Sequence, residues 1–291
     1  MKGHLWIHVL MGLLVLIFLV GGGMGFFFAL FDFLLSENIV QFGKPLLQHL
    51  MGIIFLAFFS MLVFSNIIIT LSTTYISREL DFYIPLPVER RNIFVIKLVE
   101  SIVYSSWAFA ILSFPILMAY GAASEVPAFF YPLTIISIVP FLIIPAALGA
   151  MITMVISAYL PARKTRIASL VLAGGSILAT VIMVRIMGIR RLFSLTDIKD
   201  FGQIMGFLTL GSQPTFPNYW FTQGMFAAGS GDLKSWFYWF AVLLSTALML
   251  LQVCWWMVAR LYYRGWCLAR EKEKKSTVGG KFSILNRIDG F

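Results

Sequence analysis

The sequence predicts an all-α, polytopic integral membrane protein with about six transmembrane helices. Of its 291 residues, 60% are hydrophobic and 12% are charged, a balance too apolar for a soluble domain. The hydrophobic residues form uncharged runs longer than the ~20 residues that a helix needs to cross a bilayer. A transmembrane barrel would instead show alternating strands of about ten residues, and the sequence lacks that alternation.

Six uncharged apolar runs predict the spans. They cover about residues 5–34, 48–75, 101–122, 130–158, 167–188 and 236–260. Because the run behind Lys2 exceeds the hydrophobic region of a signal peptide, we expect it to be a retained first span. We assign residues 1–265 to one six-helix transmembrane domain and residues 266–291 to a polar cytoplasmic tail.

The basic residues predict the orientation of these spans. With a cytoplasmic N-terminus, 16 of the 22 lysine and arginine residues fall in inner segments, as the positive-inside rule requires. We therefore expect a multi-pass protein of the cell (inner or plasma) membrane with both termini in the cytoplasm. The net charge of +9 follows from this arrangement, and we expect no nucleic-acid partner.

The predicted outer segment between Arg185 and Lys234 is too long for a plain connection. Its apolar stretch 201–210 is only half a span, which indicates a re-entrant or interfacial helix. Pro217 is expected to open a second short helix, with Tyr219 and Trp220 at headgroup level. Gly229 and Gly231 are expected to end it.

The segment Ser77–Glu100 holds eight of the 35 charged residues and interleaves them with large apolar side chains. Pro85 and Pro87 interrupt a helix there. Charges alone would suit a solvated loop. The apolar residues favour burial against a partner or the membrane surface: they are Leu80, Phe82, Ile84, Leu86, Val88, Ile93 and Phe94.

Catalytic and metal motifs are missing from the sequence. It contains no GxxxxGK[ST] phosphate loop and no HExxH motif, so we expect neither ATP hydrolysis nor metalloprotease activity from this chain. His4 and His8 lie one helical turn apart, but two ligands make a weak metal site. Cys254 and Cys267 have no CxxC spacing, and we interpret them as small apolar fillers.

Polar and small residues within the spans have two interpretations each. Gly21 and Gly25 favour close helix packing over a kink that gates a substrate. Asn66 favours an interhelical hydrogen bond over a substrate contact.

The segment SRELDFYIPLPVERRNIFVIKLVES, residues 77–101, resembles the loop between spans two and three in permease subunits of bacterial ABC exporters, the ABC type-two permease class. The chain is similar to one six-span half of such a transporter. The resemblance implies that a coupling helix in the 77–100 loop docks on a separate ATPase subunit. The expected partner-binding residues are Arg78, Glu79, Leu80, Asp81, Phe82, Leu86, Pro87, Arg90 and Arg91.

The resemblance also implies the partners and cofactors. This chain would carry no cofactor, and ATP and Mg would bind to the partner ATPase subunits. A second permease half or a second copy would complete an alternating-access path, with membrane lipid around it.

A non-ATP membrane protein, either a secondary transporter or a scaffold subunit, stays open as an alternative. A secondary transporter should carry ionisable residues at midspan, and Asp32, Glu100 and Arg185 all fall near span ends. Co-purification with a soluble ATPase would separate these possibilities.

Overall fold

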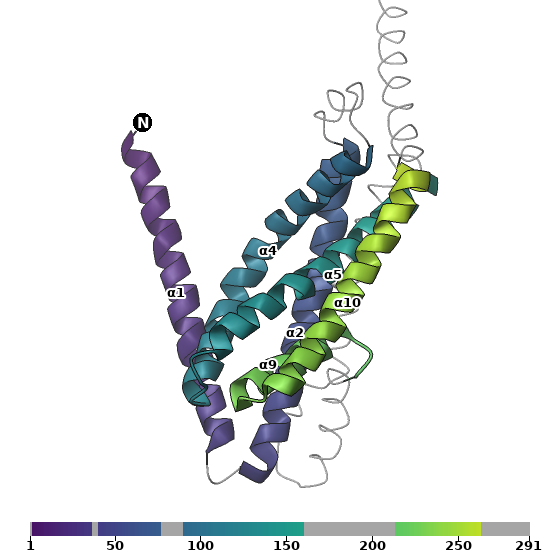
Figure 1. Cartoon of the computed structure of the whole chain (residues 1–291). Coiled ribbons are helices and arrows are strands. Elements are labelled where there is room, and N and C mark those ends of the chain that lie inside the picture. The colour runs from purple at the N-terminus through teal and green to yellow at the C-terminus, as the bar shows by residue number, and fades with distance from the viewer. Residues whose placement is uncertain (1, 37–39, 77–89, 160–212, 263–291) are drawn as a thin grey trace, which may run out of the picture. The chain divides into compact units, whose positions relative to one another are not determined.

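The computed structural model describes residues 2–36, 40–76, 90–159 and 213–262 (Figure 1). In these ranges all regular structure is helical, which confirms the all-α prediction for this part of the chain. Short π-helical turns extend α2 over Ser72–Ile76 and α10 over Val258–Tyr262. The α-helices are α1 (Lys2–Leu35), α2 (Val40–Leu71), α4 (Arg90–Ala123), α5 (Phe130–Tyr159), α9 (Pro217–Ser230) and α10 (Leu233–Met257).

Four of the described helices are long and apolar enough to cross a membrane. They are Gly43–Thr74, Asn92–Ala123, Phe130–Ala158 and Leu233–Leu261, and they match the predicted spans 48–75, 101–122, 130–158 and 236–260. The first predicted span falls within α1, where Val20–Leu35 is a shorter apolar helix. The predicted span 167–188 and the half-span 201–210 lie outside the described residues, so the six-span count stays a prediction.

The chain divides into two compact units. Unit 1 comprises residues 1–59, 106–141 and 185–244, and unit 2 comprises residues 60–105, 142–184 and 245–291. The helices α2, α4, α5 and α10 each contribute one segment to each unit.

The charged segment is shorter than the sequence predicted, because α4 begins at Arg90 and not near residue 101. Ile93 and Phe94 are 4% and 2% exposed, and Phe94 packs with Leu98 in the core of unit 2. Phe94 and Leu98 are four residues apart, which places them on one face of α4. Ile93 and Phe94 are therefore buried within the chain itself, and the expectation that a partner or the membrane surface buries them is wrong for this pair.

The core of unit 2 is built around small residues of α5. Ala146, Ala147 and Ala150 pack against Leu71 of α2 and Cys254 of α10. The thiol of Cys254 is buried and donates a hydrogen bond to Ala147 O at 3.4 Å. This confirms the interpretation of Cys254 as a small buried filler, whereas Cys267 lies outside the described residues.

Asn66 of α2 links this helix to α4 in unit 2 through hydrogen bonds. Its Nδ2 donates to Leu62 O on the same helix at 2.8 Å. Its Oδ1 accepts from the hydroxyls of Ser101 and Ser105 on α4, at 2.9 Å and 3.2 Å. The predicted interhelical hydrogen bond is thus confirmed, with two donors in place of one.

Gly149 allows α5 to approach α2 closely. A Cβ at this position would lie 2.8 Å from Asn66 Cβ and 3.0 Å from Ile67 N. One turn later, the buried hydroxyl of Thr153 lies 3.2 Å from Ile67 O, and it donates to Gly149 O at 2.8 Å. Glycine is therefore required here by backbone contact.

Aromatic rings form the core of unit 1. Phe55 of α2, Phe141 of α5 and Phe221 of α9 are all fully buried. The ring centroid of Phe221 lies 4.8 Å from that of Phe55 and 4.7 Å from that of Phe141. Such pairs add specific ring contacts to the burial of apolar area, and they fix α9 against two membrane-length helices.

The glycines of the first span pack differently from the prediction. A Cβ at Gly21 or Gly25 would meet nothing within 4 Å, whereas one at Gly23 would lie 3.6 Å from the ring of Pro115 in α4. Among the described residues, Gly23 therefore makes the helix contact that was expected of Gly21 and Gly25.

We predict that Gly149→Leu destabilises the protein by about 1–3 kcal/mol, the usual cost of overpacking a tight core. The added side chain would collide with Asn66 and the backbone of Ile67. Thermal unfolding of the purified chain in detergent measures the effect. Gly25→Leu is the matched control, because its position is open, and equal melting temperatures for the two variants would contradict the prediction.

Candidate functional site

Helix α9 brings polar groups to the ends of the membrane-length helices. Asn218, Phe221, Thr222 and Met225 form its buried face, with the spacing of an amphipathic helix. Asn218 Nδ2 donates to Gly52 O at 2.9 Å, which joins the first turn of α9 to α2. The same helix lines a cavity with Gln223, Phe226, Ala227, Gly229 and Ser230.

α9 begins and ends largely where the sequence predicted. Pro217 is its first residue, a position where the missing N–H costs nothing. Gly231 ends it in the left-handed conformation, φ 79°, with its N–H directed at Ala227 O and Ala228 O. Gly229 lies inside the helix, so its predicted role in ending α9 is wrong.

A cavity of about 690 Å³ lies in unit 1. It is bordered by the last turn of α1, the first turns of α2, the end of α4, the C-terminal half of α9 and the start of α10. Its polar lining residues are Lys44, Gln48, Tyr120, Ser124, Glu125, Gln223, Ser230, Asp232 and Ser235. Its other lining residues are Leu35, Leu47, Ala123, Phe226, Ala227, Gly229 and Trp239.

Asp232 supplies a fixed negative charge at this cavity. Its Oδ1 accepts hydrogen bonds from the backbone N–H groups of Lys234 and Ser235, both at 3.2 Å, and its Oδ2 accepts from the Ser235 hydroxyl at 2.6 Å. It therefore caps α10. The hydrogen bond from the Ser235 side chain, together with the backbone hydrogen bonds, holds the pKa of Asp232 below its usual range.

Glu125 supplies the second carboxylate from the turn after α4. Its φ of 48° is the only positive value at a non-glycine position among the described residues. The N–H of Val126 bonds to Gly121 O at 3.3 Å and closes the turn. A left-handed residue with a side chain costs roughly 1–2 kcal/mol more than one in an ordinary conformation, so the turn retains a glutamate where glycine would be more stable.

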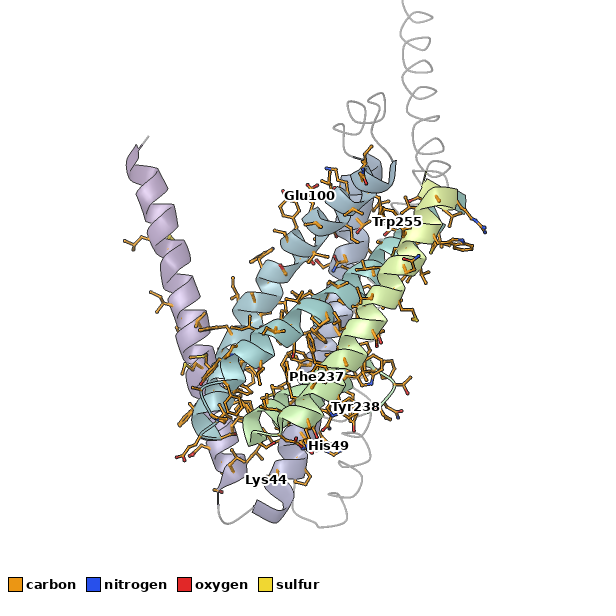
Figure 2. All side chains as sticks on the ribbon, in the orientation of Figure 1. Lys44, His49, Glu100, Phe237, Tyr238 and Trp255 are labelled. Carbon is orange, nitrogen blue, oxygen red and sulfur yellow. The ribbon has the colours of Figure 1, made fainter. Side chains whose placement is uncertain are left out.

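Aromatic residues of the kind found at a membrane–water boundary lie next to the cavity. The first turns of α10 carry an aromatic run over residues 236–240, and Tyr and Trp concentrate at that boundary. Phe237 and Tyr238, labelled on α10 in Figure 2, are 64% and 60% exposed. Trp239 turns inward to line the cavity, and its ring centroid lies 5.5 Å from that of Tyr219.

The predicted partner-binding residues are only partly covered by the structure. Arg78, Glu79, Leu80, Asp81, Phe82, Leu86 and Pro87 lie outside the described residues. Arg90 and Arg91 are the first residues of α4. Their partner-binding role stays a prediction.

Sequence reasoning missed the cavity, although two signals for parts of it were present. Asp232 stands before an apolar run and three residues ahead of Ser235, an arrangement typical of a helix start. Lys44 is a charge near the start of α2, where Figure 2 labels it together with His49. Nothing in the local sequence indicates the left-handed conformation of Glu125.

Comparison with known proteins gives a family match over almost the whole chain. The model of the family described as "Putative ATP-binding cassette" matches residues 2–289. No curated protein and no solved structure matches the chain.

This match corrects the functional assignment drawn from the sequence. The resemblance of residues 77–101 indicated the permease subunit of an exporter, but the family description names an ATP-binding cassette and not a permease. The permease assignment is therefore wrong on this finding. The described helices also differ from a typical ABC ATPase fold, in which a phosphate loop joins a strand to a helix. By a match that spans residues 2–289, the chain belongs to the family described as "Putative ATP-binding cassette".

Proposed function

We propose that this chain is a membrane-embedded component of an ATP-binding-cassette system and that a partner subunit binds ATP and Mg. The observation that carries the proposal is the coincidence of two features in one chain. It belongs to an ATP-binding-cassette family over residues 2–289, and its described residues include four helices of membrane-spanning length.

The proposed division of labour follows from the chemistry of phosphate binding. A Walker-type loop holds phosphates with successive backbone N–H groups and a lysine in the pattern GxxxxGK[ST]. The glycine–lysine pairs of this chain, Gly43–Lys44 and Gly280–Lys281, are followed by proline and phenylalanine. Neither fits the pattern, so a second subunit is expected to supply the nucleotide site.

Nucleotide binding by this chain itself is the second candidate, and the family description favours it. Such a site would use a loop of different sequence from the Walker type. The two candidates differ in which polypeptide contacts the nucleotide.

We predict that 8-azido-ATP, photolysed on the complex purified from native membranes, labels a co-purifying subunit and leaves this chain unlabelled. Gel separation followed by mass spectrometry identifies the labelled polypeptide. Excess ATP is the competition control. Competed labelling of this chain would establish the second candidate in place of the first.

The start of α4 supports a partner contact near the 77–89 segment. Arg90 and Arg91 occupy the first turn of α4, which contains no acidic residue. Helix N-termini carry a partial positive charge, so cations there are unfavourable by roughly 0.3–1 kcal/mol each. Helix stability therefore does not explain this pair. We propose that it joins Arg78, Glu79, Leu80, Asp81, Phe82, Leu86 and Pro87 in a partner-binding surface.

We predict that reversing Arg90 and Arg91 to glutamate abolishes ATPase co-purification while membrane abundance stays normal. Acidic residues suit a helix N-terminus, and the other inner basic residues maintain the orientation. Like charges brought together at an interface can cost several kcal/mol. Quantitative immunoblotting of membranes and of the affinity-purified complex measures both outcomes.

Arg190→Glu with Arg191→Glu is the matched control, because it reverses the same dipeptide on the predicted outer side. It should leave co-purification intact. Unchanged binding in the Arg90 and Arg91 variant would count against this surface, as would equal loss in both variants.

The proposed orientation has cytoplasmic termini and places α9 outside. We predict that a single cysteine at Ser230, an exposed position, reacts with a membrane-impermeant thiol reagent in intact cells. A cysteine at Ser276 should react only after lysis. Both tests use a background with Cys254→Ala and Cys267→Ala, and the opposite labelling pattern would reverse the orientation.

A further inference from the structure

We propose that the 690 Å³ cavity of unit 1 binds the headgroup of a zwitterionic phospholipid. This proposal goes beyond the function proposed above and does not depend on an ATPase partner. It requires only that the long apolar helices lie in a membrane.

The position and size of the cavity favour a membrane amphiphile. It lies where the membrane-length helices α2 and α10 begin and α4 ends, next to an aromatic run typical of headgroup depth. Its volume falls within the roughly 300–1,000 Å³ of small-molecule sites. Leu35, Leu47 and Phe226 line it beside the polar groups. Such a wall suits a glycerol backbone and the first methylenes of acyl chains.

The charges around the cavity favour a headgroup with both signs. Among the described residues that line it, Lys44 is the one lysine or arginine, and Glu125 and Asp232 are the carboxylates. An ammonium donates hydrogen bonds to carboxylates, and a lysine is a point-charge partner for a phosphate. Trp239 adds an aromatic ring, a further kind of partner for a cation. A purely anionic lipid would meet two carboxylates with one cation to offset them.

The conformation of Glu125 agrees with a binding role. Its left-handed backbone makes glutamate less stable than glycine at this turn. Strain of this kind gathers at functional sites. Replacing Glu125 by glycine should therefore remove the carboxylate and relieve the strain together, so that loss of binding can be separated from loss of folding.

The test is lipid retention by the purified full chain. Detergent-solubilised protein is incubated with equal amounts of phosphatidylethanolamine and phosphatidylglycerol that carry identical acyl chains, and native mass spectrometry counts the bound molecules of each. The first lipid has an ammonium, and the second has hydroxyls and a net negative charge. We expect preferential retention of phosphatidylethanolamine.

Four variants assign the contacts. Lys44→Gln should lower phosphatidylethanolamine retention about fivefold, the upper end for a partly exposed charge pair. Glu125→Gln with Asp232→Asn should lower the preference for phosphatidylethanolamine by a similar factor, and asparagine retains the cap of α10. Ser230→Trp, at an exposed position of the lining, should block both lipids. Glu125→Gly should reduce the preference while the melting temperature stays the same or rises.

Matched controls lie in the same unit outside the cavity lining. Lys234→Gln removes a cation near Asp232, and Asp32→Asn removes an exposed carboxylate of α1. Both should retain phosphatidylethanolamine as the wild type does.

Equal retention of the two lipids by the wild type would overturn the proposal. So would lipid retention by the cavity variants that equals the retention by the control variants. Preference for phosphatidylglycerol, lost in Lys44→Gln and unaffected by the carboxylate variants, would identify an anionic site and also overturn it. Altered lipid retention with normal ATPase co-purification would leave the proposed function intact. Normal lipid retention and lipid preference with loss of ATPase co-purification would leave the lipid proposal intact and count against the proposed function alone.

Discussion

Buried polar groups in the membrane-length helices have no bulk water to bond with, and this constraint shapes the packing around Asn66, Thr153 and Cys254. Asn66 satisfies the constraint through one backbone carbonyl and two serine hydroxyls. Thr153 satisfies it through Gly149 O in the preceding turn of its own helix, and Cys254 of α10 satisfies it through Ala147 O of α5. The bonds that cross between helices need close packing, which explains why Gly149 and the alanines of α5 accompany them.

The same constraint places the cavity at helix ends. Backbone groups are free only where helices start and stop, so caps, turns and charged side chains gather there. Asp232 caps α10, Gly231 closes α9 and Glu125 closes the turn after α4. The cap of α10 and the turn after α4 bring the carboxylates of Asp232 and Glu125 to the lining of the cavity. A polar site can form there without a charge in the apolar part of the spans.

The sequence predicted the features that depend on composition over many residues. Four predicted spans and the start of α9 at Pro217 agree with the structure, because apolar length and proline position act locally. The start of α4 was misplaced by about three turns, since the charges at Arg90, Arg91, Lys97 and Glu100 resemble a loop in sequence. Those charges lie on the same helix as the apolar residues Ile93 and Phe94, which are buried. The cavity escaped prediction because it joins residues from five separate segments, and Glu125 takes part through a backbone conformation that its sequence does not reveal.

Membership of an ATP-binding-cassette family in a chain this apolar limits where a nucleotide could bind. Phosphates are held by backbone N–H groups that no helix has already used, and inside α2, α4, α5 and α10 those donors are engaged along the helix. A nucleotide site in this chain would therefore need residues that do not belong to α2, α4, α5 or α10, and the segments 77–89, 160–212 and 263–291 contain such residues. The last of these holds the pair Gly279–Gly280 before Lys281. A site there would lack the serine or threonine hydroxyl that binds Mg²⁺ directly after the lysine of a Walker loop, because Phe282 occupies that position. The chemistry of Mg²⁺ coordination is thus the strongest physical reason to expect the nucleotide on a second subunit.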